Sequence, residues 1–433
     1  MRVGIIGLGF VGLTLAVVAS KKMHDVFGIE INNTIKAKLR SKKAHFFEPG
    51  LDTLISRELD KKFHLVDGFE KSQQIDIFVV TVGTPLHVNS NIPNYDYIKS
   101  ALNQIKDVYT GNELIILRST VSVGTTRNVV IPFLSKISGK TEESILVAFC
   151  PERTVEGDAV KELQELPQII GANNEEAKNI AETFFRQITP TILIADSLEL
   201  AELIKLFNNT YRDVHFAIGN MFNEVAQLYG INGVEAIEIA NSSYLRSKIA
   251  RPGFVGGPCL EKDAYILTNN LPPSKGRDFI VSARKYNESL EDKVIKWVKS
   301  NDKANRPIKK ICISGLAFKG VPSTSDLRGS NGINIAKKLY DLGYELSLHD
   351  FFAIPSEVKN LNLGNFSDNL YEAAKNCSCL LVLNNSNHYL SIEAEKLDSI
   401  MLKKYVILDA WGVLDYFQYD DFYTLGNIEI HKK

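Results

Sequence analysis

The amino-terminal segment restricts the fold more than any other stretch of this chain. It reads MRVGIIGLGFVGLTLAVVAS and places Gly7, Gly9 and Gly12 directly after a short apolar run. In a strand–turn–helix unit with this spacing, the first glycine makes the tight turn, the second lets backbone approach a pyrophosphate, and the third allows close packing of helix on strand. The further glycine at position 4 also disfavours one continuous helix, so we interpret the segment as the start of a domain rather than a signal peptide.

Short apolar runs alternate with amphipathic stretches through the first part of the chain. The runs RVGIIGL, DVFGIE, IDIFVVTVGTP, ELIILRST and ILVAFCPE predict buried parallel strands, and PQIIGA is a further candidate. Amphipathic stretches such as NTIKAKLRSK and YDYIKSALNQI lie between them. This alternation predicts a doubly wound α/β domain over residues 1–196.

The pattern changes near Asp196. From there a proline-free stretch with 3.6-residue apolar spacing predicts one helix of about thirty residues, capped by Asp196 or Ser197 and ended by Gly230. A second helical region ends near Asn301, and strand-like runs return after the linker NDKANRP. The predicted fold class is therefore α/β, with two Rossmann-like doubly wound domains (1–196 and 301–433) joined by a helical middle domain (197–300).

Composition excludes several classes of partner. The chain has 433 residues, too many for one core, and a formal net charge of −1, so no global field favours nucleic acid or an anionic membrane. No other stretch is long and apolar enough to cross a bilayer. The five cysteines are odd in number and show no metal-ligand spacing, which predicts a reduced cytoplasmic protein without a metal site.

Polar residues at predicted strand ends indicate where ligands bind. Glu30 ends the second strand roughly twenty residues after the glycines, as expected for an acid that binds ribose hydroxyls and favours NAD over NADP. Thr84, Thr120 and Glu152 follow later strands. Such threonines are often only helix caps and Glu152 could be a surface acid, so the strand ends alone leave their roles open.

In the stretch RPGFVGGPCLEKDAYIL, Cys259 follows a bend rich in glycine and proline. The question is whether this cysteine is a buried apolar residue or a nucleophile. Most cysteines are small buried hydrophobes, and a nucleophile is the less common alternative. On the long predicted helix, Lys205 and Asn208 are three residues apart and share a face. A lysine beside an apolar stripe is either solvated at its edge or binds an anionic group.

Seven motifs in order carry a resemblance to a known family. GLGFVG, VGTP, RSTV, PERTVEG, AELIKLFNN, GGPCLEKD and GLAFKG with TSDLRGS are similar to those of the nucleotide-sugar 6-dehydrogenases, over about residues 1–415. The resemblance implies oxidation of a UDP-sugar at C6 to the acid with two NAD⁺, through a cysteine thiohemiacetal and thioester, for polysaccharide biosynthesis such as that of a capsule. It implies no metal, and it implies a homodimer or larger homo-oligomer.

The resemblance also implies roles for individual residues. Cys259 is the expected nucleophile, Lys205 and Asn208 the oxyanion donors, Asp263 and Thr120 the residues that hold water, and Glu152 an acid or base. Cofactor contacts are expected from Gly7, Gly9, Phe10, Val11, Gly12, Glu30, Thr84, Thr120, Glu156, Lys262 and Arg328. Substrate contacts are expected from Glu152, Lys205, Asn208, Arg246, Phe254, Gly256, Phe318 and Lys319, with Arg246 reaching across a dimer interface. We also expect Gly253, Gly256 and Gly257 to let backbone amides approach a sugar.

Departures from the family pattern leave the sugar open. Glu30 stands where aspartate is commoner, Ile35 where a basic residue is frequent, Trp411 where many members have arginine, and Pro258 where serine or histidine is usual. PER and LRSKIARPGFVGGPC resemble the N-acetylhexosamine branch, whereas CLEKD and Glu156 resemble the UDP-glucose branch. We expect a UDP-N-acetylhexosamine such as UDP-N-acetylmannosamine, with UDP-glucose as the alternative. A two-electron hydroxyacid-type dehydrogenase and a non-catalytic nucleotide-sugar sensor are the alternatives of other classes.

Overall fold

The computed structural model describes residues 1–87, 90–414 and 421–430. Its contacts divide the chain into two compact units, which we describe one at a time. The first unit contains Met1–Asn208 and Tyr265–Pro272, and the second contains Asn209–Ala264 and Pro273–Lys433.

The first unit is built on an eight-stranded sheet. Its strands run in the order β3 (Phe63–Val66), β2 (Asp25–Ile29), β1 (Arg2–Ile6), β4 (Ile77–Val80), β5 (Leu114–Leu117), β6 (Val147–Phe149), β7 (Gln168–Ala172) and β8 (Ile192–Ala195). Neighbouring strands are parallel except β6 and β7, which pair antiparallel. The sequence predicted parallel strands with PQIIGA as a further candidate, and the antiparallel direction of that strand, β7, is a feature that its apolar run did not reveal.

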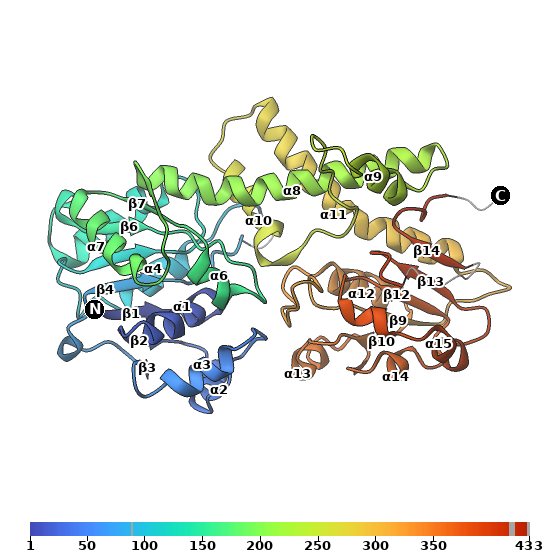
Figure 1. Cartoon of the computed structure of the whole chain (residues 1–433), viewed down its shortest axis with the longest axis horizontal. Coiled ribbons are helices and arrows are strands. Elements are labelled where there is room, and N and C mark those ends of the chain that lie inside the picture. Colours follow the sequence, from blue (N-terminus) through green and yellow to red (C-terminus); the bar gives the residue numbers. More distant parts are fainter. Residues whose placement is uncertain (88–89, 415–420, 431–433) are drawn as a thin grey trace. The chain divides into compact units, whose positions relative to one another are not determined.

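Helices cover both faces of this sheet, as the blue-to-green part of Figure 1 shows. On one face the core is formed with α1 (Phe10–Lys21), α3 (Leu51–Glu58), α6 (Ala159–Glu165) and α7 (Glu175–Arg186). On the other face it is formed with α4 (Asp96–Asn103) and α5 (Ile131–Ser138). The helix α2 (Asn33–Arg40) follows β2, and short helical turns occupy Lys71–Gln73, Thr126–Val130 and Glu142–Ser144. Two covered faces explain why the strands are apolar runs rather than alternating ones.

The long predicted helix is present as α8 (Leu198–Leu228). The backbone N–H of Leu200 donates to the Ser197 hydroxyl at 3.0 Å, so Ser197 caps the first turn. Gly230 follows the helix with φ of 72°, a left-handed conformation that glycine adopts without steric cost. Both predicted ends of the helix are therefore confirmed.

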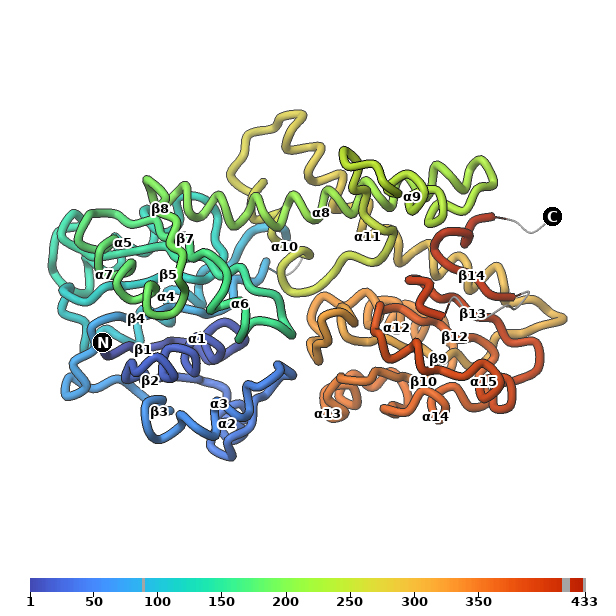
Figure 2. The backbone as a smooth tube through the Cα atoms, in the orientation of Figure 1, coloured from blue at the N-terminus to red at the C-terminus, as the bar shows by residue number. Residues whose placement is uncertain are grey.

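The second unit contains three more helices of the middle region and a six-stranded sheet. The helices are α9 (Gly233–Asn241), α10 (Gly257–Thr268), whose last residues fall in the first unit, and α11 (Lys275–Asn301). The strand order is β11 (Asn365–Ser367), β10 (Glu345–His349), β9 (Lys310–Ser314), β12 (Cys379–Val382), β13 (Val406–Asp409) and β14 (Phe422–Thr424), all parallel. The orange-to-red tube in Figure 2 follows this second sheet.

Two cores again cover the faces of the second sheet. One is formed with α11 and α12 (Asn331–Asp341), and the other with α14 (Leu370–Ala374) and α15 (Ala394–Ile400). The helix α13 (Pro355–Lys359) follows β10, and a short helical turn occupies Asn387–Ser391. The chain thus has two Rossmann-like sheets and a helical middle region, which confirms the predicted fold class. In the described part of the chain, every helix is too short or too polar to traverse a lipid bilayer.

Candidate cofactor and catalytic sites

The three glycines after β1 each meet a different geometric need. Gly7 has φ of 90° and makes the turn. A Cβ placed on Gly12 would lie 1.9 Å from the Gly7 carbonyl oxygen, so α1 can start against the turn only with glycine there. A Cβ on Gly9 would have no described atom within 4 Å, so this glycine borders open space. Close packing at Gly12 and open space at Gly9 are what a dinucleotide-binding loop requires, and the loop therefore fits NAD.

The acid expected to bind ribose is tied to the same loop. Glu30 follows β2 and is buried; its carboxylate accepts the Leu8 N–H at 3.0 Å and the Asn32 N–H at 2.8 Å. Each oxygen keeps a further lone pair for a hydroxyl donor. Phe10 and Val11, both half-buried, begin α1, whose amino-terminal amides face the end of the sheet where pyrophosphate binds in this fold. This position suits all three residues to the cofactor contacts expected of them.

The loops after β4 and β5 are held together by the two threonines that the sequence singled out. The Thr84 hydroxyl donates to the Thr120 carbonyl oxygen at 2.6 Å. Ser119 similarly donates to the Val82 carbonyl at 2.6 Å. Thr84 is buried and Thr120 is half-buried. The structure therefore brings both threonines to one edge of the sheet.

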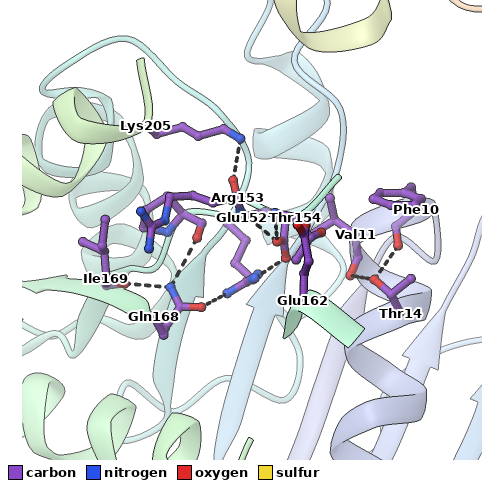
Figure 3. Close-up of polar contacts among 12 residues, drawn as sticks. Phe10, Val11, Thr14, Glu152, Arg153, Thr154, Glu162, Gln168, Ile169 and Lys205 are labelled. Carbon is purple, nitrogen blue, oxygen red and sulfur yellow. Dashed lines mark hydrogen bonds and ion pairs between the residues drawn. The ribbon is translucent and has the colours of Figure 1, made fainter. Parts of the chain in front are cut away.

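Glu152 follows β6, and three groups bind its carboxylate. One carboxylate oxygen accepts the backbone N–H groups of Arg153 and Thr154, each at 2.8 Å, and the other pairs with the Arg118 guanidinium. Arg118 also donates to the Gln168 side-chain oxygen at 2.8 Å. Figure 3 shows Glu152 beside Arg153 and Thr154, with Lys205 approaching its main chain. The Lys205 ammonium donates to the Glu152 carbonyl oxygen.

The charge of Glu152 follows from these partners. Burial by itself would raise the pKa of the Glu152 carboxyl, but the Arg118 guanidinium and the Thr154 N–H outweigh it and hold the pKa below its usual value. The carboxyl is thus ionised at neutral pH. Of the two roles expected from the sequence, base and acid, the structure favours base.

The structure separates the two neighbouring asparagines of α8. Asn208 is exposed, and its amide donates to the Ile204 carbonyl one turn back at 2.7 Å. Asn209 is buried, and its amide donates at 2.6 Å to the carboxylate of Asp263, which is fully buried. The other oxygen of Asp263 lies 2.9 Å from the Lys262 ammonium. The family resemblance implied Asn208 as a second oxyanion donor beside Lys205, and that role stays a prediction. The contact with Asp263 is made by Asn209.

Cys259 is exposed and is the third residue of α10. At the amino-terminal end of a helix, backbone N–H groups favour a negative charge. The other four cysteines are buried, and burial raises the pKa of the Cys150 thiol to about 12. Exposure and helix position therefore distinguish Cys259 as the residue suited to be a nucleophile.

The glycines before Cys259 serve internal packing within the second unit. A Cβ on Gly253 would lie 2.3 Å from the Trp411 ring, one on Gly256 would lie 2.3 Å from the Gly329 carbonyl oxygen, and one on Gly257 would lie 2.5 Å from the Phe318 ring. The structure gives these glycines a further reason, close contact with the carboxy-terminal sheet domain, and their expected place beside a sugar stays a prediction. Trp411, unusual at its position, thus lies directly against this loop.

The remaining expected residues lie in several environments. Phe254 is buried in the core, so only its main chain is available to a ligand. Arg246 is exposed and stacks over Tyr244, with its guanidinium carbon 5.0 Å from the ring centroid. Lys319 lies over the Phe318 ring at 5.5 Å. Arg328 is exposed and pairs with Asp326 at 2.6 Å, while Glu156 is half-buried in the turn before α6.

Sequence reasoning missed Arg118 and Asn209. Arg118 lies in the run ELIILRST, where a charge beside buried strand residues signals a buried partner. Asn209 is four residues from Lys205, a spacing that shares a helix face as well as three does. Within the described ranges, no group of three or more His, Cys, Asp or Glu side chains is arranged to hold a metal ion.

Comparison with known proteins identifies the family. Three models of the UDP-glucose/GDP-mannose dehydrogenase family match the chain: the NAD-binding domain over residues 1–189, the central domain over 199–289 and the UDP-binding domain over 312–416. The chain therefore belongs to the UDP-glucose/GDP-mannose dehydrogenase family, and it is an NAD-dependent oxidoreductase of nucleotide sugars.

Individual relatives are similar over nearly the whole length. The UDP-N-acetyl-D-mannosamine dehydrogenase of Methanocaldococcus jannaschii is 32% identical, with 96% of this chain and 93% of the relative covered. That of Pyrococcus horikoshii is 30% identical, with 96% of each chain covered. A solved structure of the Pyrococcus horikoshii UDP-D-ManNAc dehydrogenase matches with a TM-score of 0.87 and 28% identity, covering 99% of this chain and all of that one.

Proposed function

We propose that this chain oxidises UDP-N-acetylmannosamine, or a closely related UDP-N-acetylhexosamine, at C6 to the corresponding uronate. The single observation that carries the four-electron chemistry is Cys259, exposed at the start of α10 and four residues before the buried Asp263. The choice of sugar is supported by the names of the relatives that match at 30% and 32% identity.

The chemistry proceeds in two oxidations. NAD⁺ supplies the hydride acceptor for each, and the Gly7–Gly12 loop, Glu30, Thr84 and Thr120 are suited to hold it. The C6 alcohol loses a hydride and a proton to give an aldehyde, which the Cys259 thiolate attacks with uptake of one proton to form a thiohemiacetal. Loss of a second hydride and proton gives a thioester. Water then attacks the thioester carbon and gives up its two protons to the base and the solvent, which releases the carboxylate and returns the sulfur as thiolate.

Three polar residues have proposed roles around these steps. The Lys205 ammonium stabilises the alkoxide and the oxyanion of the tetrahedral species. We assign the binding of water to Asp263, whose carboxylate accepts the Asn209 amide at 2.6 Å, and to Thr120. Glu152, ionised by its pairing with Arg118, assists water attack as a base. Asn208, expected from the sequence as a second oxyanion donor, binds its own helix, so we assign the neighbouring Asn209 to the site as the residue that orients Asp263.

The remaining contacts follow the sequence expectations. We assign further cofactor contacts to Phe10, Val11, Glu156, Lys262 and Arg328. We assign substrate contacts to Arg246, Phe318 and Lys319 and to the main chain at Phe254 and Gly256. The cationic Lys319 and the guanidinium of Arg246 suit the negative charge of a nucleoside diphosphate.

The substrate assignment is tested by NADH release from a panel of nucleotide sugars under matched conditions. UDP-N-acetylmannosamine should give the highest kcat/KM. A higher kcat/KM with UDP-glucose would transfer the assignment to that sugar while keeping the chemistry. One NADH per molecule of a hydroxyacid, or nucleotide-sugar binding without any NADH, would favour a two-electron dehydrogenase or a sensor.

We also propose a homodimer formed through the middle region. Within the second unit, α8 and its following turn expose large apolar side chains at helical spacing; these are Met221, Phe222, Val225, Leu228 and Tyr229. Contiguous exposed apolar side chains of this kind are typical of interfaces. Leu228→Asp should convert the dimer to a monomer in sedimentation, and an unchanged mass would count against this surface.

Two further expectations remain proposals. We place the reaction in the cytoplasm, because no disulfide joins the cysteines in the described part of the chain and nucleotide cofactors are cytoplasmic reagents. We also retain three functional segments, 1–196, 197–300 and 301–433. A fragment 1–196 that binds NAD⁺ by itself would support the first boundary.

A further inference from the structure

A buried arginine that has no part in the proposed mechanism hydrogen-bonds to the main chain around Cys259. Arg284 lies on α11 and is only 1% exposed. One terminal nitrogen donates to the Val255 carbonyl at 3.0 Å, and the other donates to the Leu260 carbonyl at 3.2 Å. One guanidinium therefore binds the main chain on both sides of Cys259, four residues before it and one residue after it.

The guanidinium is itself fixed by a buried acid. The nitrogen that binds Leu260 also donates to Asp213 of α8 at 2.8 Å, and both side chains of this ion pair are 1% exposed. Asn287, one turn beyond Arg284 on α11, donates to the same Asp213 oxygen at 2.8 Å. A planar guanidinium with several fixed donors can serve the acid and two carbonyls at once, which an ammonium cannot do in the same geometry.

The same network reaches the beginning of the loop. Asn220 of α8 accepts the Gly253 N–H at 2.9 Å and donates to the Gly253 carbonyl at 3.1 Å. Its amide also donates to the Asn287 side-chain oxygen at 3.0 Å. Asn220 and Asn287 are both buried. The loop is thus bound to the helix pair through the main chain of residues 253, 255 and 260.

We propose that Arg284 is the positioning residue for Cys259: it sets the main-chain geometry that aims the sulfur, and this rests on the proposed role of Cys259 as nucleophile. Arg284 touches neither substrate nor cofactor in this account. A nucleophile displaced by a fraction of a bond length loses much of its rate while binding changes little, so the effect belongs in kcat.

The decisive variant is Arg284→Lys. The lysine keeps a positive charge for Asp213 but cannot bridge both carbonyls. We expect the variant to fold, to exchange the amides of residues 253–260 at least about tenfold faster, and to lose about 100-fold in kcat with KM for the sugar within about threefold. If Arg284 served only to join α11 to α8, Arg284→Lys would leave both the amide exchange of residues 253–260 and kcat at their wild-type values. That result would overturn the proposal.

Lys293→Gln is the matched control. Lys293 also lies on α11 and pairs with Glu224 of α8 at 2.6 Å, but its ammonium contacts Glu224 and Glu429 rather than the loop. Exchange of residues 253–260 and kcat should stay within about twofold of wild type. An equal loss in this variant would show a general loosening of the helix pair and would overturn the assignment to Arg284.

Asp213→Asn provides a second test, which does not require that Arg284→Lys folds. It removes one buried negative charge but keeps a side-chain oxygen for Arg284 and Asn287, and the Glu288 carboxylate stays 3.3 Å from the guanidinium. Both carbonyl contacts of Arg284 also remain, so loop exchange should stay within about threefold of wild type. A tenfold increase would contradict the proposal. Wild-type enzyme that releases no NADH with any sugar would refute the proposed function, whereas the exchange measurement would still decide whether Arg284 holds the loop.

Discussion

Arg118 and Glu152 form an ion pair inside the first unit, with only 1% and 8% of their side chains exposed. The pair joins the end of β5 to the loop after β6, where Lys205 binds the same residue's carbonyl. A buried pair of this kind is costly to break from one side, because the remaining charge loses its partner. It also keeps Glu152 ionised, as its proposed role as a base requires.

Removing the charge of Arg118 alone should therefore lower the free energy of unfolding more than removing the charges of both Arg118 and Glu152. We expect Arg118→Met to lower the free energy of unfolding of the first unit by about 3–5 kcal/mol, measured by urea denaturation. The double variant Arg118→Met/Glu152→Gln should recover more than half of this loss, because the glutamine oxygen can still accept the Arg153 and Thr154 amides. A double variant no more stable than the single one would contradict the ion-pair account.

The glycine loop offers two substitutions with opposite expected outcomes. Gly12→Ala would place a Cβ 1.9 Å from the Gly7 carbonyl oxygen and should lower the melting temperature and abolish NAD⁺ binding together. Gly9→Ala meets no described atom within 4 Å, so it should fold normally and weaken NAD⁺ by about tenfold, roughly 1.4 kcal/mol. Calorimetric titration with thermal unfolding distinguishes them, and unchanged NAD⁺ affinity in Gly9→Ala would argue against this loop as the cofactor site.

The two asparagines of α8 provide a direct comparison of neighbouring residues. Asn209→Ala deprives the buried Asp263 of its 2.6 Å donor, which should cost about 1–3 kcal/mol in stability and lower kcat/KM at least about tenfold. Asn208→Ala removes only an exposed contact with its own helix and should leave kcat/KM within about twofold. A larger loss in Asn208→Ala would return the donor role to that residue.

Whether a feature could be predicted from the sequence depends on how far apart along the chain the interacting residues lie. The turns at Gly7 and Gly12 and the ends of α8 at Ser197 and Gly230 were predictable, because each depends on residues a few positions away. The antiparallel β7, the pairing of Arg118 with Glu152, and the contact of Trp411 with Gly253 join distant segments whose patterns do not encode each other. For the same reason, helix periodicity could not decide between Asn208 and Asn209, and Arg284 gave no signal.

Acid should destabilise the second unit through one buried histidine. His349 ends β10 and lies 2.7 Å from the Ser314 hydroxyl, and burial lowers its pKa from 6.5 to about 3. As the pH falls, His349 becomes protonated in the unfolded chain near pH 6.5 but in the folded chain only near pH 3. The free energy of unfolding is therefore unaffected by this group above pH 6.5 and decreases as the pH falls from 6.5 towards 3. Between pH 7 and pH 5 the loss from this group is about 2 kcal/mol.

The matched experiment compares wild type with His349→Asn in urea unfolding at both pH values. The variant should lose about 2 kcal/mol less between pH 7 and pH 5 than the wild type does, since the other titrating groups are common to both. Equal losses in the two proteins would show that His349 is not the group responsible.

The central claim is that Cys259 carries the sugar through two oxidations. The most direct measurement is the ratio of NADH released to UDP-N-acetylmannosamine consumed, with the product identified by mass spectrometry, in wild type and Cys259→Ser. The account predicts two NADH and one uronate per sugar for the wild type, and loss of uronate formation in a variant that still binds NAD⁺. One NADH per sugar in the wild type, or full uronate formation by Cys259→Ser, would contradict it.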